Sequence, residues 1–396
     1  MPPVDASPTQ LWNRAFLHLT AGHALQAVGY TTMLLFPLHL ERLNATRSVI
    51  GLLTALSGLA GLVSRPFVAR GLDLLGARRV IAASTVLLAA SIAMAGFVDA
   101  IGPLVVCQRI LFGVSVGALF TAYFKAAADW IPPASRTRGI ALFGLSGILP
   151  LLLLPFVEQI ARAFDTPLAS IYPVAACVIA VSGLLAWPVR DAPRLHPPAP
   201  FAWRHLLDSV RTPALRPVWI AAATFSGMVS VYMAFSTVAA RKAGLEAPAM
   251  LWLWYALGSA VVRTVGGGLP DRIGPTRLIL PSVAAYLAGL TGLALAEGEV
   301  DFALASCVAG VGHGYCFPVL MGLVIARSDE ASRANAVATY TAIWGTLELL
   351  APPIFGVIAD SAGDGPMFAL VAVVGAAGTL RWALAERALP AALRQS

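Results

Sequence analysis

Apolar segments long enough to cross a lipid bilayer recur along this chain from residue 14 to residue 386. A transmembrane helix needs about 20 predominantly apolar residues. Hydrophobic residues make up 58% of the 396 positions and charged residues 12%, whereas soluble domains average about 45–50% and about 25%. Backbone polar groups in lipid need partners within their own segment, so these runs must be helices, and the lack of strand-like alternation disfavours a barrel. The sequence therefore predicts an all-α integral membrane protein.

Helix-breaking residues divide the apolar sequence into twelve expected transmembrane helices. The stretch 189–214 is rich in proline and arginine and separates the sixth helix from the seventh. We expect residues 1–188 and 215–396 to form two pseudo-symmetric six-helix bundles, joined by a cytoplasmic linker at 189–214. The twelve helices are expected over residues 14–40, 48–69, 79–98, 103–127, 139–162, 168–188, 215–240, 249–269, 277–296, 302–326, 333–359 and 366–386.

The 27 Lys and Arg residues, which leave a net charge of +7, are distributed unevenly across this topology. Twenty fall on one side of the membrane, five on the other, and Arg109 and Lys125 fall within a segment. Basic residues concentrate on the cytoplasmic side of membrane proteins. This pattern places both termini in the cytoplasm and argues against nucleic acid as the partner that explains the charge.

A charged hairpin occurs twice, once after the second expected helix and once after the eighth. The offset is 198 residues, and a further match at 197 residues aligns Gly113 and Gly117 with Gly310 and Gly314. A duplicated apolar bundle with a charged hairpin in each half is the plan of a secondary transporter. In the hairpins themselves, Arg65, Asp73, Gly76 and Arg79 match Arg263, Asp271, Gly274 and Arg277.

Both hairpins resemble the signature of the major facilitator superfamily, which is a glycine, three residues, Asp, two residues, Gly and then basic residues. The second copy has the first glycine, Gly267, whereas the first copy has Ala69 in its place. The resemblance covers nearly the whole chain. It implies a twelve-helix transporter whose hairpin Asp latches the two halves on the cytoplasmic side; the alternative is that these charges only enforce topology. The expected gating motif comprises Asp73, Gly76, Arg78, Arg79, Gly267, Asp271, Gly274 and Arg277.

Two charged residues of the first half are candidates for a role inside the membrane. Arg109 lies roughly 9 Å inside the fourth helix at 1.5 Å per residue, and the run from Arg109 to Gly113 resembles the family motif whose Arg is tied to substrate or proton coupling. An intramembrane charge is a functional candidate by default, although Arg109 could also extend to the surface. Glu158 lies at a similar depth on the fifth helix, so an ion pair with Arg109 is one expectation and a position among lipid headgroups is the other.

Five further residues are candidates for the substrate or proton pathway. Tyr340, Trp344 and Glu348 recur every four residues and form one stripe on the eleventh helix. Desolvation favours the protonated form of a carboxyl at the depth of Glu348, which suits a proton carrier, although a protonated Glu can also serve helix packing. The resemblance makes the first, fourth, seventh and tenth helices cavity walls, which points to Gln26 and His313; a structural hydrogen bond is the alternative for His313.

The sequence thus predicts a secondary active transporter that moves a small molecule across a bacterial inner membrane by alternating access, with proton-coupled export favoured. The alternatives are proton-coupled uptake of a small organic acid and a lipid flippase of the same fold. An enzyme is not expected, because no nucleophile with its base and no cluster of metal ligands shares one depth. Basic groups outnumber acidic ones along the expected path, which favours an anionic, zwitterionic or neutral polar substrate. We expect protons and lipid as partners, a monomer, and no cofactor, metal or nucleic acid.

Overall fold

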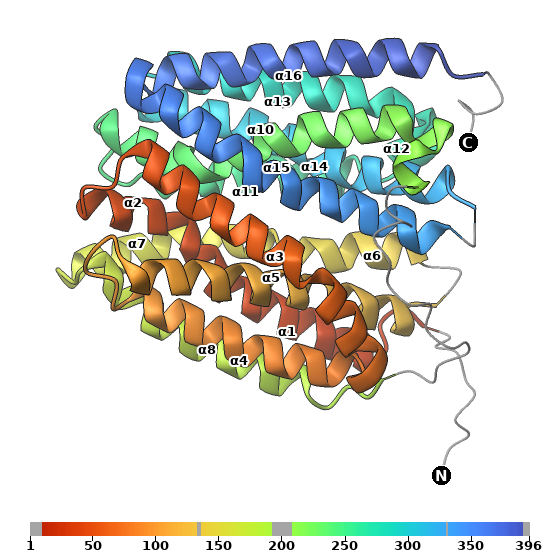
Figure 1. Ribbon diagram of the computed structural model, residues 1–396, viewed down its shortest axis with the longest axis horizontal. Helices are drawn as coiled ribbons and strands as arrows, with labels where there is room; N and C mark the ends of the chain where they lie inside the picture. The colour runs from red at the N-terminus through yellow and green to blue at the C-terminus, as the bar shows by residue number, and fades with distance from the viewer. Residues whose placement is uncertain (1–9, 133–135, 192–207, 330–331, 391–396) are drawn as a thin grey trace. The chain divides into compact units, whose positions relative to one another are not determined.

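The computed structural model describes residues 10–132, 136–191, 208–329 and 332–390, and the regular secondary structure in these ranges is helical (Figure 1). Ten of the described helical segments have the length and hydropathy to cross a membrane. The apolar helix α11 (Met250–Val265) is shorter. The all-α membrane fold class predicted from the sequence is therefore confirmed.

The chain divides into two compact units. Unit 1 comprises Met1–Met33 and Ala60–Phe201, and unit 2 comprises Leu34–Leu59 and Ala202–Ser396. The long helix α3 (Arg47–Leu75) contributes its first part to unit 2 and the remainder to unit 1. Residues 192–207 of the expected linker lie outside the described residues, so the expected bundle boundaries at 188 and 215 stay a prediction.

The helices of unit 1 pack in an order that unit 2 repeats. In it α4 packs against α5 and α8, and α1 packs against α8. The bounds are α1 (Arg14–Thr31), α4 (Ala77–Ala95), α5 (Pro103–Trp130), α6 (Arg136–Leu145), the 3-10 helix η3 (Leu149–Leu153), α7 (Leu154–Ala163) and α8 (Ile171–Ala186).

Unit 2 repeats this order of neighbours. In it α13 packs against α14 and α16, and α10 packs against α16 and α15, while α11 packs against α14. The contacts of α13 with α14 and α16 thus correspond to those of α4 with α5 and α8, and the contact of α10 with α16 corresponds to that of α1 with α8. This correspondence agrees with the sequence repeat. The bounds are α2 (Phe36–Arg42), α10 (Arg216–Lys242), α12 (Leu269–Ile273), α13 (Pro275–Leu295), α14 (Glu299–Ala326), α15 (Arg333–Ala362) and α16 (Asp364–Arg387).

Three expected helices are interrupted or shorter in the structure. The first is divided by a 3-10 turn over Thr32–Leu35, after which Pro37 opens α2. The fifth changes to 3-10 geometry between α6 and α7, where Pro150 lies. Proline lacks the N–H that an α-helix needs, which explains both changes. The eighth ends at Val265 rather than 269, because three consecutive glycines from Gly266 follow and glycine disfavours the helix interior.

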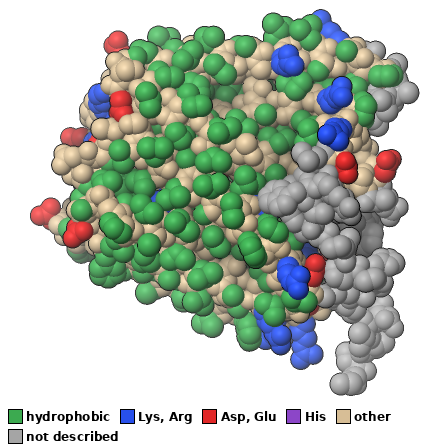
Figure 2. Space-filling view, in the orientation of Figure 1, with side chains coloured by type: hydrophobic (Ala, Val, Ile, Leu, Met, Phe, Trp, Pro, Cys, Tyr) green, Lys and Arg blue, Asp and Glu red, His purple; other side chains and the backbone are tan. Residues whose placement is uncertain are grey.

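The exposed surface of the helices is apolar along most of their length. Figure 2 shows hydrophobic side chains over much of the visible face, with Lys, Arg, Asp and Glu near the helix ends. Large apolar side chains such as Leu52, Phe67 and Val265 are exposed on these helices. Such a surface is unfavourable in water and is what contact with lipid tails requires.

Glycines bring α3 close to a neighbour within each unit. In unit 2, Gly51 and Gly58 face α15, and a Cβ added at Gly58 would lie 3.0 Å from the backbone nitrogen of Leu349. In unit 1, a Cβ at Gly61 would lie 3.0 Å from the carbonyl oxygen of Gly113 on α5. Small residues let membrane helices pack at short range.

A charged cluster joins residues 34–59 to the C-terminal helices of unit 2. The guanidinium of Arg47 donates to Glu41 at 2.8 Å and to Asp364 at 3.0 Å. The Asp360 carboxylate accepts from the backbone N–H groups of Arg47 and Ser48 at 2.7 and 2.9 Å. A carboxylate at a helix N-terminus satisfies free N–H groups and is favoured by the helix dipole. This cluster explains why the start of α3 groups with α15 and α16.

A second ion pair in unit 2 is almost completely enclosed. Arg327, which follows α14, donates to both carboxylate oxygens of Glu386 on α16 at 2.6 and 2.9 Å. The Arg327 side chain is 0% exposed and the Glu386 side chain 10%. Arg327 also lies 3.4 Å from the hydroxyl of Thr276 at the start of α13. The pair therefore links the ends of three helices.

Candidate substrate and gating sites

An aromatic cluster in unit 2 surrounds His313 of α14. The Tyr255 hydroxyl, from α11, forms a hydrogen bond with His313 Nδ1. The imidazole stacks on the Trp344 ring from α15, with centroids 6.4 Å apart, and meets the edge of Phe225 from α10 at 5.7 Å. Four helices therefore hold one imidazole in a fixed orientation.

A polar stripe on α11 faces α14 beside this cluster. Tyr255, Ser259 and Arg263 lie four residues apart, which places them on one face of the helix. Arg263 Nε donates to the carbonyl oxygen of Gly314 at 3.0 Å. A Cβ at Gly314 would lie 3.1 Å from the Cα of Ser259, so glycine permits this close approach of the two helices. The stripe places the Arg263 guanidinium, in the last turn of α11, near the His313 imidazole of α14.

The structure brings together three of the residues proposed from the sequence. His313 stacks on Trp344, and the Trp344 ring lies 6.3 Å from that of Tyr340, whose hydroxyl donates to the carbonyl oxygen of Phe317 at 3.2 Å. Glu348 is half-buried one turn further along α15. We did not single out Tyr255 or Arg263 for the substrate site, although their spacing along α11 is a signal that could have found them.

The candidates of unit 1 are buried. Gln26 is 4% exposed, Arg109 is 7% exposed, and the Arg109 guanidinium lies 4.8 Å from the centre of the Phe112 ring. Glu158 is 3% exposed and accepts from Arg162, one turn along α7, at 2.7 Å. We did not foresee the Arg162 partner, and the ion pair between Arg109 and Glu158 stays a prediction.

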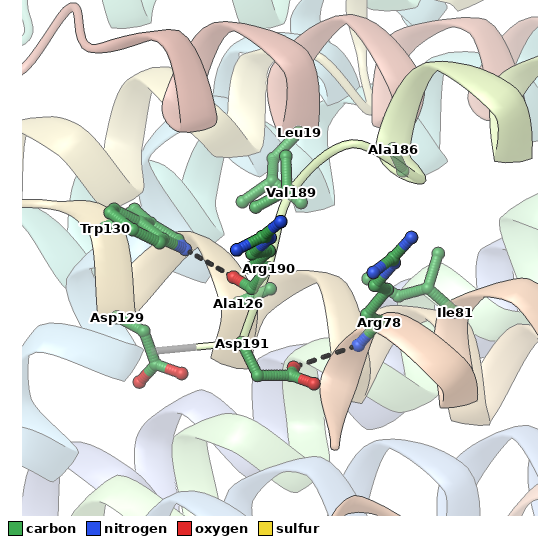
Figure 3. Close-up of a pocket in the computed structure, with 10 residues that line it drawn as sticks. All are labelled: Leu19, Arg78, Ile81, Ala126, Asp129, Trp130, Ala186, Val189, Arg190 and Asp191. Carbon is green, nitrogen blue, oxygen red and sulfur yellow. Dashed lines mark hydrogen bonds between the residues drawn. The ribbon is translucent and has the colours of Figure 1, made fainter. Parts of the chain in front are cut away.

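The first hairpin is anchored by the residues that follow α8 (Figure 3). Gly76 has a φ of 84°, a left-handed conformation that favours glycine, and a Cβ there would collide with the Asp191 carboxylate. Asp191 accepts from the Arg78 backbone N–H at 3.0 Å, at the start of α4. Nearby, Trp130 Nε1 donates to the carbonyl oxygen of Arg190 at 3.2 Å. Nothing in the sequence pattern pointed to this role for Asp191.

The second hairpin has the same backbone turn in more open surroundings. Gly274 has a φ of 90°, and a Cβ there would meet no atom within 4 Å. Arg277 is exposed, as are Gly267 and, in the first hairpin, Arg79, while Asp73 is half-buried. The side chain of Asp271 lies outside the described residues.

The sequence as a whole matches one family. The family model described as Major Facilitator Superfamily matches residues 19–300 and 249–396. The chain belongs to the Major Facilitator Superfamily. It is therefore a multi-pass membrane protein of the secondary-transporter kind, and the family resemblance seen in the hairpins is confirmed.

Relatives and solved structures within the superfamily agree with this assignment. The chain is 28% identical over 324 residues to the probable nitrate/nitrite transporter NarK2 of Mycobacterium tuberculosis, which covers 76% of this chain and 78% of NarK2. A crystal structure of the nucleoside transporter NupG covers 94% of this chain and 99% of its own, with a TM-score of 0.75 and 13% identity. A crystal structure of the human organic anion transporter MFSD10 covers 96% of this chain and 100% of its own, with a TM-score of 0.73 and 15% identity. The structural likenesses show the superfamily fold.

Membership in the superfamily does not by itself assign roles to individual residues. The gating function of the two hairpins and the pathway function of the buried residues stay predictions. Within the described residues there is also no group of three or more His, Cys, Asp or Glu side chains placed to hold a metal ion.

Proposed function

We propose that this protein transports a small inorganic oxyanion of the nitrate or nitrite type. The similarity to NarK2 over three quarters of the chain supports this class of substrate. The observation that carries the proposal is the placement of the Arg263 guanidinium, in the last turn of α11, on the stripe that faces the helix carrying His313. A guanidinium is planar, always charged and matched to oxyanion geometry.

The surroundings of Arg263 suit a small anion better than a bulky substrate. The bond between Tyr255 and His313 uses one polar hydrogen and leaves the pair one other, and Ser259 Oγ is buried with no hydrogen-bond partner in the described part of the chain. Buried polar atoms normally have a partner, so a water or a ligand is expected at Ser259. The aromatic rings of Phe225 and Trp344 limit the space around the imidazole.

Coupling, direction and location are further parts of the proposal. We propose that protons supply the energy and that the protein lies in the bacterial cytoplasmic membrane with both termini inside. Export was favoured by the sequence, and uptake was its alternative. A transported anion is pushed outward by an inside-negative potential, so uptake against that potential needs a coupled driving force, which a co-transported proton supplies.

Nitrate binding to the purified protein tests the proposed substrate. A ligand at about 100 times its Kd stabilises the folded state by about 2.7 kcal/mol, so nitrate should raise the unfolding temperature in detergent. Arg263→Gln should abolish this shift, and Arg263→Lys should restore part of it because charge remains without the planar fork. Arg272→Gln is the matched control, since Arg272 is exposed on the neighbouring helix α12.

Three results would contradict the proposal. Equal stabilisation of Arg263→Gln and the wild type would remove Arg263 from the site. Stabilisation by small carboxylates but not by nitrate or nitrite would favour the organic-acid alternative, and stabilisation by lipid headgroups alone would favour a flippase.

A further inference from the structure

His23 of unit 1 lies in a pocket of aromatic rings beside the 3-10 segment of the fifth membrane helix. The residue is 6% exposed, and its imidazole stacks on the Phe143 ring with centroids 4.7 Å apart. The edges of the Tyr123 and Phe124 rings from α5 lie at 5.3 and 6.0 Å. A Cβ at Gly147 would lie 3.1 Å from His23 Cε1, so glycine leaves the room that the ring occupies.

The hydrogen bonds of Ser146 determine which ring nitrogen of His23 carries the hydrogen. Ser146 Oγ lies 2.6 Å from the carbonyl oxygen of Phe143 and 2.6 Å from His23 Nδ1. Two oxygens at that separation need a hydrogen between them, and a carbonyl has none, so the hydroxyl donates to Phe143. His23 Nδ1 must then donate to Ser146 Oγ. The neutral ring therefore has its lone pair on Nε2.

Other polar atoms near His23 on α1 also lack partners. Gln26 Oε1 and Thr20 Oγ1 are enclosed and form no hydrogen bond with any described residue, and each lies three positions from His23 along the helix. Unpaired buried oxygens indicate a site for water or for a ligand. His23 Nε2, Gln26 Oε1 and Thr20 Oγ1 thus lie within two turns of α1, and we call these three atoms a patch.

The helix beside this patch is locally rewound. The N–H groups of Ser146, Gly147 and Ile148 bond to carbonyls three residues back, at 3.1, 3.3 and 3.0 Å, before η3 begins. A 3-10 stretch inside a membrane helix often marks a hinge, and interrupted helices line the ligand sites of many transporters. The element that sets the His23 tautomer is thus suited to change its geometry during transport.

We propose that His23 binds the coupling proton and that the anion of the proposed function passes this patch during transport only together with that proton. A neutral ring presents a lone pair, which repels an anion. A protonated ring presents an N–H at Nε2 and a positive charge, which attracts one. The only titratable side chain in ring contact with His23 is Tyr123 of α5, and no charged side chain among the described residues forms a hydrogen bond, ion pair or ring contact with it.

The direction of coupling follows from this arrangement. An anion and a proton that pass only together cross the membrane together, so an inward proton gradient drives anion uptake. This inference rests on the proposed function and favours its uptake form over the export form.

Proton uptake on nitrate binding tests the proposal. Purified protein in weakly buffered detergent near neutral pH should take up about one proton per bound nitrate, because the proposal has the proton arrive with the anion. His23→Gln should bind nitrate about tenfold more weakly or worse, through loss of a charge-assisted hydrogen bond, and without proton uptake. His18→Gln is the control, because His18 is exposed on the same helix and lies near Leu185 O. Unchanged proton uptake in His23→Gln would overturn the proposal, as would nitrate binding by the wild type without any proton.

A spectroscopic measurement separates this proposal from the proposed function. The ¹⁵N NMR spectrum of histidine-labelled protein, assigned with His23→Gln, should show the Nδ1–H tautomer at His23, and Ser146→Ala should shift it toward a mixture. An Nε2–H tautomer in the wild type would overturn the proposal. If the wild type binds no nitrate, the proposed function fails and this inference fails with it, whereas nitrate binding with the wrong tautomer overturns only the inference.

Discussion

Removing Glu386 should destabilise the protein more than almost any other single change of charge. Glu386→Gln leaves the Arg327 guanidinium, whose side chain is 0% exposed, without its carboxylate. The Thr276 hydroxyl at 3.4 Å is a weak replacement. Breaking a buried ion pair by removing one partner costs about 3–5 kcal/mol, because a desolvated charge remains.

A double variant separates the charge from the packing. Arg327→Met with Glu386→Met removes both charges, and replacement of a whole buried pair by apolar residues is often neutral or stabilising. We therefore expect the double variant to be more stable than Glu386→Gln. Asp129→Asn is the matched control, because Asp129 and Lys125 form a pair one turn apart with side chains 33% and 45% exposed. Such exposed helix pairs are worth about 0.3–0.5 kcal/mol.

Equilibrium unfolding in mixed micelles, followed by the loss of helical circular dichroism, measures these differences in unfolding free energy. A Glu386→Gln variant within about 1 kcal/mol of the wild type would refute the reasoning, because uncompensated buried charges cost several kcal/mol. A double variant as unstable as the single one would show that packing, rather than charge, dominates.

Three further predictions concern the hairpins and the buried arginine. Asp73→Asn should largely abolish transport in vesicles while expression and folding persist, and Asp271→Asn should have a milder effect; unchanged transport in both would remove the gating role. Gly76→Ala should lower the unfolding free energy more than Gly274→Ala. An alanine in the left-handed conformation costs about 1–2 kcal/mol at either position, but only Gly76→Ala also displaces Asp191. Equal losses of unfolding free energy would contradict this. Arg109→Ala should weaken anion binding, measured by titration, and Arg109→Lys should restore it only in part; binding indifferent to Arg109 would exclude that residue.

The sequence was sufficient to predict the helices because the physical signal is local. Membrane helices are recognised by the length and apolar composition of their segments. The recurrence of Asp73 and Gly76 as Asp271 and Gly274 indicated the internal duplication. The 3-10 segment around Pro150 was not predicted. The apolar run continues through Pro150, and the length of that run favoured one continuous helix. Pro150 was visible in the sequence, but whether a proline interrupts a membrane helix depends on the residues packed around it.

The site was predicted only where one helix carries the pattern. Tyr340 and Trp344 share a face of α15, so their association was foreseeable. Arg263 was assigned to the hairpin because of the repeat, and its contact with Gly314 depends on how α11 packs on α14. The contact between Arg47 and Asp364 joins residues 317 positions apart, and one sequence contains no signal for such a pairing.

Nitrate flux in proteoliposomes tests the central claim most directly. Liposomes containing the purified protein and an internal nitrate reporter are given an inward proton gradient by acidifying the outside. We predict that nitrate accumulates inside, that accumulation collapses when a protonophore removes the gradient, and that Arg263→Gln abolishes it while Arg272→Gln does not. Nitrate and nitrite that fail to enter under any gradient, while another class of solute does, would contradict the account.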